Sequence, residues 1–202
     1  VRHTSGYLCA PMTEERADQL GLPLMWPTSQ DPLRTRYTVA VDAACGITTG
    51  IDAAQRARTA RVLADATSTP TDLVRPGHVL PLRARAGGVL ERRGHTEAAV
   101  DLARLAGLEP VGLIGELVGD DGMCLRADAI ADLACAEGLA FITIDQLAQW
   151  RRVHDTVLAA PPRRVMALAS AQLPTRYGHF TIAGYRDNLT GAEHVLLVGE
   201  KG

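Results

Sequence analysis

Apolar and polar positions follow two periods along this chain, and together they predict an alternating series of strands and helices. Tyr37, Val39 and Val41 alternate with their neighbours over residues 37–42, which is the period of a half-buried strand. Other short apolar runs predict strands at residues 7–10, 111–118 and 139–144. Helical patterns occur at residues 13–20, 52–64, 96–107, 127–137 and from 145 onward. Such alternation favours helices packed on a sheet.

Polar residues at the start of the helical patterns supply the expected helix caps. Thr13 precedes two glutamates, and acidic residues in a first turn complement the helix dipole. Asp52, with Gln55 three residues later, has the form of a capping box. Thr96 and Asp145 are expected to cap the helices that follow them.

Two stretches interrupt the pattern. Pro70, Pro76 and Pro81 are expected to break the chain into short strands and turns. A composition rich in alanine, proline and arginine predicts a linker, or alternatively an exposed helix, over residues 154–172. Residues 173–202 then restart as a hairpin-like β segment. Because a lone hairpin is marginally stable, this segment is expected to begin a second domain.

Composition narrows the class of protein and of ligand. The chain has 202 residues, of which 47% are hydrophobic and 22% charged, as suits a folded protein with a buried core. A net charge of −2 and an aromatic content of 4% favour a small ligand over nucleic acid. The four cysteines lack zinc-ligand or disulfide spacing, and no apolar run approaches the ~20 residues of a membrane span. A cytoplasmic protein with no membrane partner is therefore expected.

Residues 92–96 form the first candidate site. Arg92, His95 and Thr96 flank a glycine turn at the start of a predicted helix, where free N–H groups and the helix dipole favour an anion such as phosphate. Arginine adds bidentate donors for the same ligand. In the alternative, structural interpretation, Thr96 only caps the helix and Arg92 only faces solvent.

His78 and Glu116 are further candidates. His78 follows Pro-Gly, so it is either a hydrogen-bonded turn residue or an acid–base or metal-binding group on a rigid turn. Glu116 interrupts an apolar strand, either as an edge carboxylate that faces water or pairs with arginine, or as a buried functional acid whose pKa is perturbed. Residues 48–50 and 120–122 are either ligand loops or plain turns.

Four stretches, taken together and in order, resemble one family. They are RHTSGYLCAPM, TVAVDAACGITTGIDAAQRA, DLVRPGHVLPLRARAGGVLERRGHTEAAVDLARLAGL and GELVGDDGM. Each is similar to a segment of 3,4-dihydroxy-2-butanone 4-phosphate synthase, an enzyme of riboflavin biosynthesis, and the similarity covers residues 1–153. The tail over residues 173–202 resembles the opening strands of GTP cyclohydrolase II, which many bacteria fuse behind the synthase.

The resemblance implies a fold, a reaction and a set of ligands. The implied fold is α+β, with three α/β/α layers around a mixed twisted sheet, and the implied assembly is a homodimer. The implied activity is a lyase that converts D-ribulose 5-phosphate to L-3,4-dihydroxy-2-butanone 4-phosphate and formate with Mg²⁺ or Mn²⁺. Histidine and carboxylate groups suit the proton transfers of such a reaction, and a divalent cation polarises its oxygens.

The resemblance also assigns roles to residues of the first candidate site. Arg92, Arg93, Gly94, His95 and Thr96 fall on the family's substrate-binding motif. Within this motif, His95 falls on a metal-ligand position.

The remaining roles belong to His78 and Glu116, which fall on positions essential for catalysis, with Glu116 also at a substrate-binding position. The family's acidic run, similar to Asp-Arg-Glu-Asn-Glu-Gly-Asp, supplies the second metal-binding carboxylate and has no counterpart in this sequence. We therefore expect that run to lie upstream of Val1. The rival hypothesis is a non-catalytic module that binds a sugar phosphate or mediates dimerisation.

Overall fold

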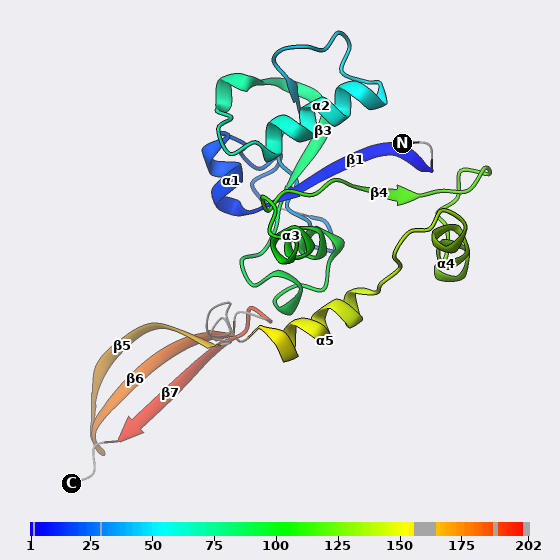
Figure 1. Cartoon of the computed structure of the whole chain (residues 1–202). Helices are drawn as coiled ribbons and strands as arrows, with labels where there is room; N and C mark the ends of the chain where they lie inside the picture. The colour runs from blue at the N-terminus through cyan, green and yellow to red at the C-terminus, as the bar shows by residue number, and fades with distance from the viewer. Residues whose placement is uncertain (2, 29, 156–164, 188–189, 200–202) are drawn as a thin grey trace. The chain divides into compact units, whose positions relative to one another are not determined.

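The chain folds into two units (Figure 1). The computed structural model describes residues 1, 3–28, 30–155, 165–187 and 190–199. Residues 1–154 form the first unit and residues 155–202 the second. A mixed sheet with helices lies in the first unit and a separate antiparallel sheet in the second, so the expected α+β class is confirmed.

The mixed sheet of the first unit has the strand order β2-β3-β1-β4. The central pair, β1 and β3, is parallel, with Cys9 opposite Leu80. Both outer strands run antiparallel to their neighbours, and Leu8 of β1 lies opposite Gly115 of β4. The strands are β1 (Thr4–Met12), β2 (Val41–Ala43), β3 (Leu73–Arg83) and β4 (Ile114–Leu117).

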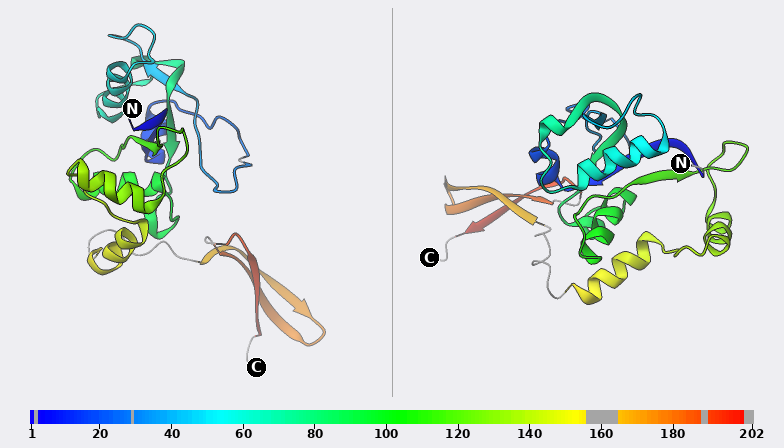
Figure 2. Two further views of the ribbon diagram at one scale, coloured as in Figure 1. Left: turned by 90° about the vertical axis from the view of Figure 1, so that its right-hand side faces the viewer. Right: turned by 45° about the horizontal axis from the view of Figure 1, so that its top comes forward.

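Helices α2 and α3 pack alongside this sheet, α2 against β2 and β3 and α3 against β1 and β4 (Figure 2, cyan and green). The α-helices are α1 (Glu14–Gln19), α2 (Ala53–Ala64), α3 (His95–Leu105), α4 (Ala127–Ala136) and α5 (Ile144–His154). Two short 3-10 helices are η1 (Pro70–Asp72) and η2 (Gly88–Leu90). Among the described residues, no helix is both long and apolar enough to cross a membrane.

Two apolar clusters hold the first unit together. The larger joins β1, α1, β2, α2 and β3 through Ala10, Met12, Ala17, Leu20, Leu22, Val41, Leu63, Leu73 and Val79. The smaller one brings α5 against η2 and α3 through Val89, Ala98, Leu147 and Ala148. Beside it, the buried Arg151 guanidinium donates to the Asp101 carboxylate at 2.7 Å, so the burial of both charges is offset by pairing.

Two of the predicted caps are confirmed. The Thr13 hydroxyl accepts a hydrogen bond from the backbone N–H of Arg16 at 3.1 Å and begins α1. The Asp52 carboxylate accepts from the backbone N–H of Gln55 at 2.9 Å and begins α2. Each bond satisfies an N–H group that the helix itself leaves unpaired.

The other two predicted caps are wrong. Gly94 is the cap of α3, and Thr96 lies inside the helix. At α5 the cap is Thr143, which forms a reciprocal capping box with Gln146 at 2.8 and 3.2 Å. This box places the helix start at the residue before Asp145 and leaves no strand over residues 139–144, where one was expected.

The prolines of β3 do not break the strand as predicted. Pro76 and Pro81 both lie within β3, which runs without interruption over Leu73–Arg83. Pro76 falls in the register shift of β3 against β2, between Val74 and Val79, and Pro81 lies opposite Ala10 of the parallel partner β1. His78 is therefore a strand residue and not a turn residue.

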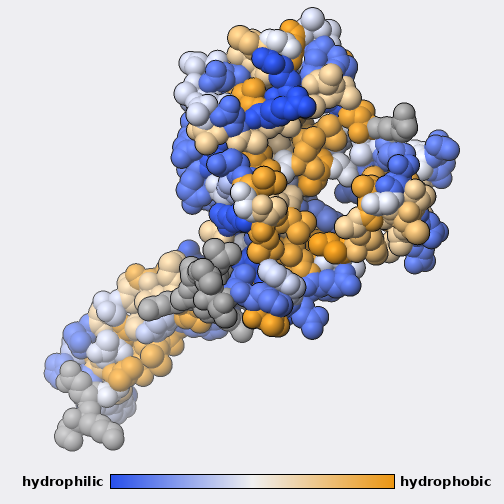
Figure 3. All heavy atoms as spheres, viewed as in Figure 1, coloured by the Kyte–Doolittle hydropathy of each residue, from blue (hydrophilic) through white to orange (hydrophobic). Residues whose placement is uncertain are grey.

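The second unit is a three-stranded antiparallel sheet of order β5-β6-β7. Its strands are β5 (Val165–Thr175), β6 (Gly178–Asp187) and β7 (Glu193–Gly199). β5 begins inside the range 154–172 that was predicted as a linker, and residues 156–164 of that range lie outside the described residues. Large apolar side chains of this sheet, among them Val195 and Leu197, are exposed (Figure 3).

Candidate active site

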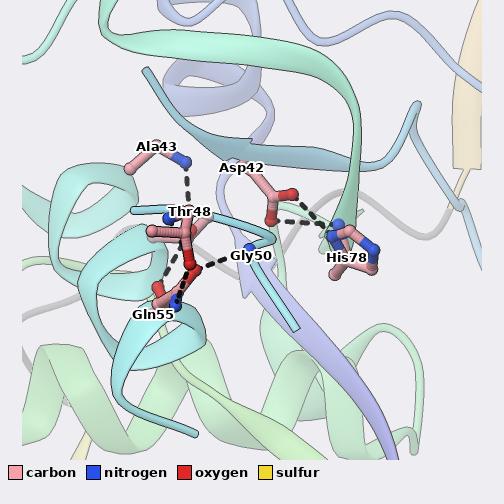
Figure 4. A network of polar contacts seen from close by, with 7 residues as sticks. Asp42, Ala43, Thr48, Gly50, Gln55 and His78 are labelled. Atoms are coloured by element: carbon pink, nitrogen blue, oxygen red, sulfur yellow. Dashed lines mark hydrogen bonds and ion pairs between the residues drawn. The ribbon is translucent and has the colours of Figure 1, made fainter. Parts of the chain in front are cut away.

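A buried carboxylate and an exposed imidazole face each other between β2 and β3 (Figure 4). Asp42 accepts a hydrogen bond from the backbone N–H of His78 at 3.0 Å through Oδ1, and its Oδ2 lies 2.6 Å from His78 Nδ1. The Asp42 side chain is 6% exposed, whereas that of His78 is 42% exposed. The pair thus has one sealed end and one end that is open to a ligand.

The turn over residues 46–50 packs against this pair. The Gln55 side-chain oxygen accepts from the backbone N–H groups of Thr48 at 2.9 Å and Gly50 at 2.6 Å, and so holds the turn. Gly50 has φ +80°, and a Cβ there would overlap the Asp42 carboxylate. The turn over residues 48–50 is therefore held in place, and its Gly50 lies directly against the Asp42–His78 pair.

Sequence reasoning found His78 and missed Asp42. The signal available was the polar end of the alternating run at residues 37–42. An aspartate there is unremarkable until the fold places β3 beside β2. Its partner is 36 positions away, and only the strand pairing brings the two together.

The start of α3 carries the second group of candidates. The cap residue Gly94 has no side chain with which to accept from the first-turn N–H groups. His95, the first residue of the helix, is exposed, while Thr96 is 5% exposed. This helix end therefore presents backbone donors and one imidazole, and the Thr96 hydroxyl is turned into the protein.

Arg92 is bound into the scaffold. Its Nη1 donates at 2.5 Å to Glu97, a residue that is 1% exposed, and its Nε and Nη2 donate to the Leu33 carbonyl at 3.0 and 2.7 Å. Nη2 also donates to the Thr35 hydroxyl at 3.1 Å. The interpretation of Arg92 as a solvent-facing side chain is therefore wrong.

Arg93 has a different environment. Its guanidinium pairs with Asp145 on α5, and both side chains are largely exposed. An exposed ion pair of this kind is weak, so Arg93 can exchange its partner for another anion.

Glu116 lies on β4 and is exposed, so the alternative of a buried acid is wrong. Its charge still acts on β1. Burial raises the pKa of the Cys9 thiol to about 11, and the negative charge of Glu116 adds to this rise. Burial likewise raises the pKa of Tyr7, on β1, and of Tyr37.

The described residues do not build a complete metal cage. In those ranges, no three His, Cys, Asp or Glu residues come together as a metal-binding group. The exposed His95 offers one nitrogen. The 120–122 segment is a turn closed by the N–H of Gly122 on the Gly119 carbonyl at 2.9 Å.

Comparisons with known proteins identify the family of this chain. Residues 1–150 match the family model described as 3,4-dihydroxy-2-butanone 4-phosphate synthase. Over 198 residues the chain is 52% identical to the riboflavin biosynthesis protein RibBA of Salinispora tropica, and over 200 residues it is 52% identical to RibBA of Nocardia farcinica. These alignments cover 98% of the chain but only 48% and 47% of the relatives. The chain thus spans about half the length of the curated relatives it matches.

Solved structures that resemble this chain are also 3,4-dihydroxy-2-butanone 4-phosphate synthases. A 3,4-dihydroxy-2-butanone 4-phosphate synthase in complex with two magnesium ions superimposes with a TM-score of 0.74 at 45% identity, covering 78% of this chain and 79% of that one. RibBX of A. baumannii, a two-domain synthase, superimposes with a TM-score of 0.72 at 40% identity, covering 99% and 56%. The chain belongs to the 3,4-dihydroxy-2-butanone 4-phosphate synthase family.

Proposed function

We propose that the protein converts D-ribulose 5-phosphate to L-3,4-dihydroxy-2-butanone 4-phosphate and formate in riboflavin biosynthesis. The observation that carries the proposal is the family match over residues 1–150, within which His78 faces solvent beside a buried carboxylate. A reaction that moves protons repeatedly needs a group that both accepts and donates them near neutral pH, and imidazole does so.

His78 and Glu116 are the proposed catalytic residues. Both side chains are exposed, so both can reach a bound substrate. His78 accepts and returns protons at Nε2, because Nδ1 is occupied by Asp42. Glu116 serves as a second base and binds a substrate hydroxyl, because an ionised carboxylate accepts the hydrogen bond that a hydroxyl donates.

The start of α3 is the proposed phosphate-binding segment. Backbone N–H groups of His95 and Thr96 point out of the helix end, where the dipole favours an anion. Arg93 supplies an exposed guanidinium once it leaves Asp145. Arg92 and Gly94 contribute by fixing the turn, since a Cβ at Gly94 would overlap the Arg92 guanidinium.

Mg²⁺ or Mn²⁺ is the proposed cofactor, and His95 is its proposed ligand. One exposed imidazole is compatible with Mg²⁺, which retains waters and takes oxygens from its substrate, but it does not make a site alone. His95 is thus proposed as one ligand, since the described residues form no group of three metal-binding side chains.

Further aspects of the proposal come from the RibBA relatives. Residues 173–202 are proposed as the start of a GTP cyclohydrolase II domain, and the alignment with RibBA over 98% of the chain supports this proposal. We also propose a homodimer that works in the cytoplasm. Sedimentation of the purified protein tests the dimer, and a monomer with full turnover would contradict it.

The direct test is a formate assay on the complete gene product with D-ribulose 5-phosphate. Formate and the four-carbon phosphate should appear in equal amounts, stop when EDTA removes the metal, and resume with Mg²⁺ or Mn²⁺. A protein that binds the sugar phosphate in calorimetry and releases no formate would instead be the non-catalytic module.

A further inference from the structure

We infer that Asp42 is a positioning residue that fixes the proton of His78 on Nδ1 and leaves the lone pair of Nε2 facing the substrate. The inference deepens the proposed function and rests on the role of His78 in proton transfer. Asp42 itself touches no substrate in this account, because its carboxylate is sealed behind the imidazole.

The geometry of the pair carries the argument. An ionised carboxylate only accepts hydrogen bonds, so a Nδ1 that lies 2.6 Å from Asp42 Oδ2 must carry the proton. A neutral imidazole has a donor at one nitrogen and an acceptor at the other, and Nε2 is therefore the base. The same carboxylate accepts the His78 backbone N–H at 3.0 Å, which ties ring and strand to one anchor.

The surroundings leave Asp42 no other position. A Cβ at Gly77 would run into the backbone of Val41, which shows how closely β2 and β3 approach at this point. On the other side Gly50 lies against both the Asp42 carboxylate and the His78 ring. With 6% of its side chain exposed, Asp42 interacts with the imidazole in a medium that screens charge weakly.

A purely structural ion pair would show the same contacts, and the substitution Asp42→Asn separates the two roles. The asparagine oxygen still accepts the His78 backbone N–H, so the strand pairing is retained. Its amide group then faces Nδ1 as a donor. The imidazole must accept there and carry its proton on Nε2, which is the wrong nitrogen for a base that faces the substrate.

The test combines nitrogen-15 spectra of the His78 ring with formate kinetics. At alkaline pH, where the ring is neutral, the unsubstituted protein should show a protonated Nδ1, and Asp42→Asn should show a protonated Nε2. Its kcat should fall by roughly 10²- to 10⁴-fold with little change in KM and in melting temperature. Asp128→Asn, the same substitution at an exposed residue of α4, should change none of these.

Two results would overturn the inference. One is a protonated Nε2 in the unsubstituted protein, a measurement that needs no variant and stands even if Asp42→Asn fails to fold. The other is Asp42→Asn with the inverted proton position and a kcat within threefold of normal. Failure of the proposed function is distinct from both, because a protein without formate release would still report the position of the His78 proton.

Discussion

Two buried carboxylates, Asp42 and Glu97, lie beside the two Gly-His segments of the chain and do different work. Asp42 faces His78, and the imidazole beyond it is open to solvent. Glu97 faces Arg92, whose other donors bind Leu33 and Thr35, so that pair is directed inward. One carboxylate orients a reactive group and the other anchors a loop to the start of α3.

For function, the group that is left exposed beside a buried acid matters more than the identity of the residue that the acid binds. The similar segments Arg-Pro-Gly-His and Arg-Arg-Gly-His differ in which side chain pairs with the buried acid. In the first, the histidine pairs with the buried carboxylate, and the arginine, Arg75, donates only to backbone carbonyls among the described contacts. In the second the arginine is paired and His95 is left exposed at the helix start.

The largest expected effect is that of His95→Ala on turnover. If His95 is the metal ligand of the second segment, its loss should reduce formate release by at least about 1000-fold, equivalent to about 4 kcal/mol. Melting temperature should not change, because the side chain is exposed. Near-normal turnover of His95→Ala would show that His95 is not a metal ligand.

Glu97→Gln should give the next largest effect, and on stability. The substitution leaves the Arg92 guanidinium without its charged partner, and urea titration should show a loss of about 2 kcal/mol in the free energy of unfolding. Glu109→Gln, at an exposed position just after α3, is the matched control and should change nothing. Equal stability of the two variants would show that Glu97 is no anchor.

A smaller effect should appear at Cys9, a buried group whose pKa is raised by burial and not lowered by pairing. The folded state favours the neutral thiol, so its contribution is complete below the unfolded pKa, 9.0, and is lost as the pH rises through about 11. The stability advantage over Cys9→Ala should therefore shrink by about 1–2 kcal/mol between these pH values. A constant difference across the range would show that the thiol is not desolvated.

The smallest expected effect is that of Arg93→Ala on stability. The ion pair with Asp145 is exposed, so the free energy of unfolding should change by less than about 0.5 kcal/mol. The neighbouring Arg92→Ala should cost clearly more in the same urea titration. If the two substitutions cost the same, the contrast between an anchored and an available arginine does not hold.

The sequence predicted two of the four proposed helix caps, both at side chains that begin their own helix. Thr13 and Asp52 act over three residues, and both caps are confirmed. Thr96 and Asp145 failed because other residues nearby, Gly94 and Thr143, take the cap positions. Which of several neighbouring residues becomes the helix cap depends on backbone geometry that composition does not encode.

The functional pairs were harder to predict because they join distant parts of the chain. The resemblance assigned roles to His78 and Glu116, whereas Asp42 enters only through the pairing of β2 with β3. Likewise, the partners of Arg92 at Leu33 and Thr35 lie nearly 60 positions away. The extended course of β3 through Pro76 and Pro81 also needed neighbouring strands that a local pattern does not show.

The most direct test of the account is the turnover of His78→Gln in the complete gene product. Glutamine keeps a polar side chain on β3 but cannot relay a proton. If His78 transfers the protons of the reaction, formate release from D-ribulose 5-phosphate should fall at least about 100-fold while the melting temperature stays nearly unchanged. Turnover within threefold of that of the unsubstituted protein would show that His78 does not have this role.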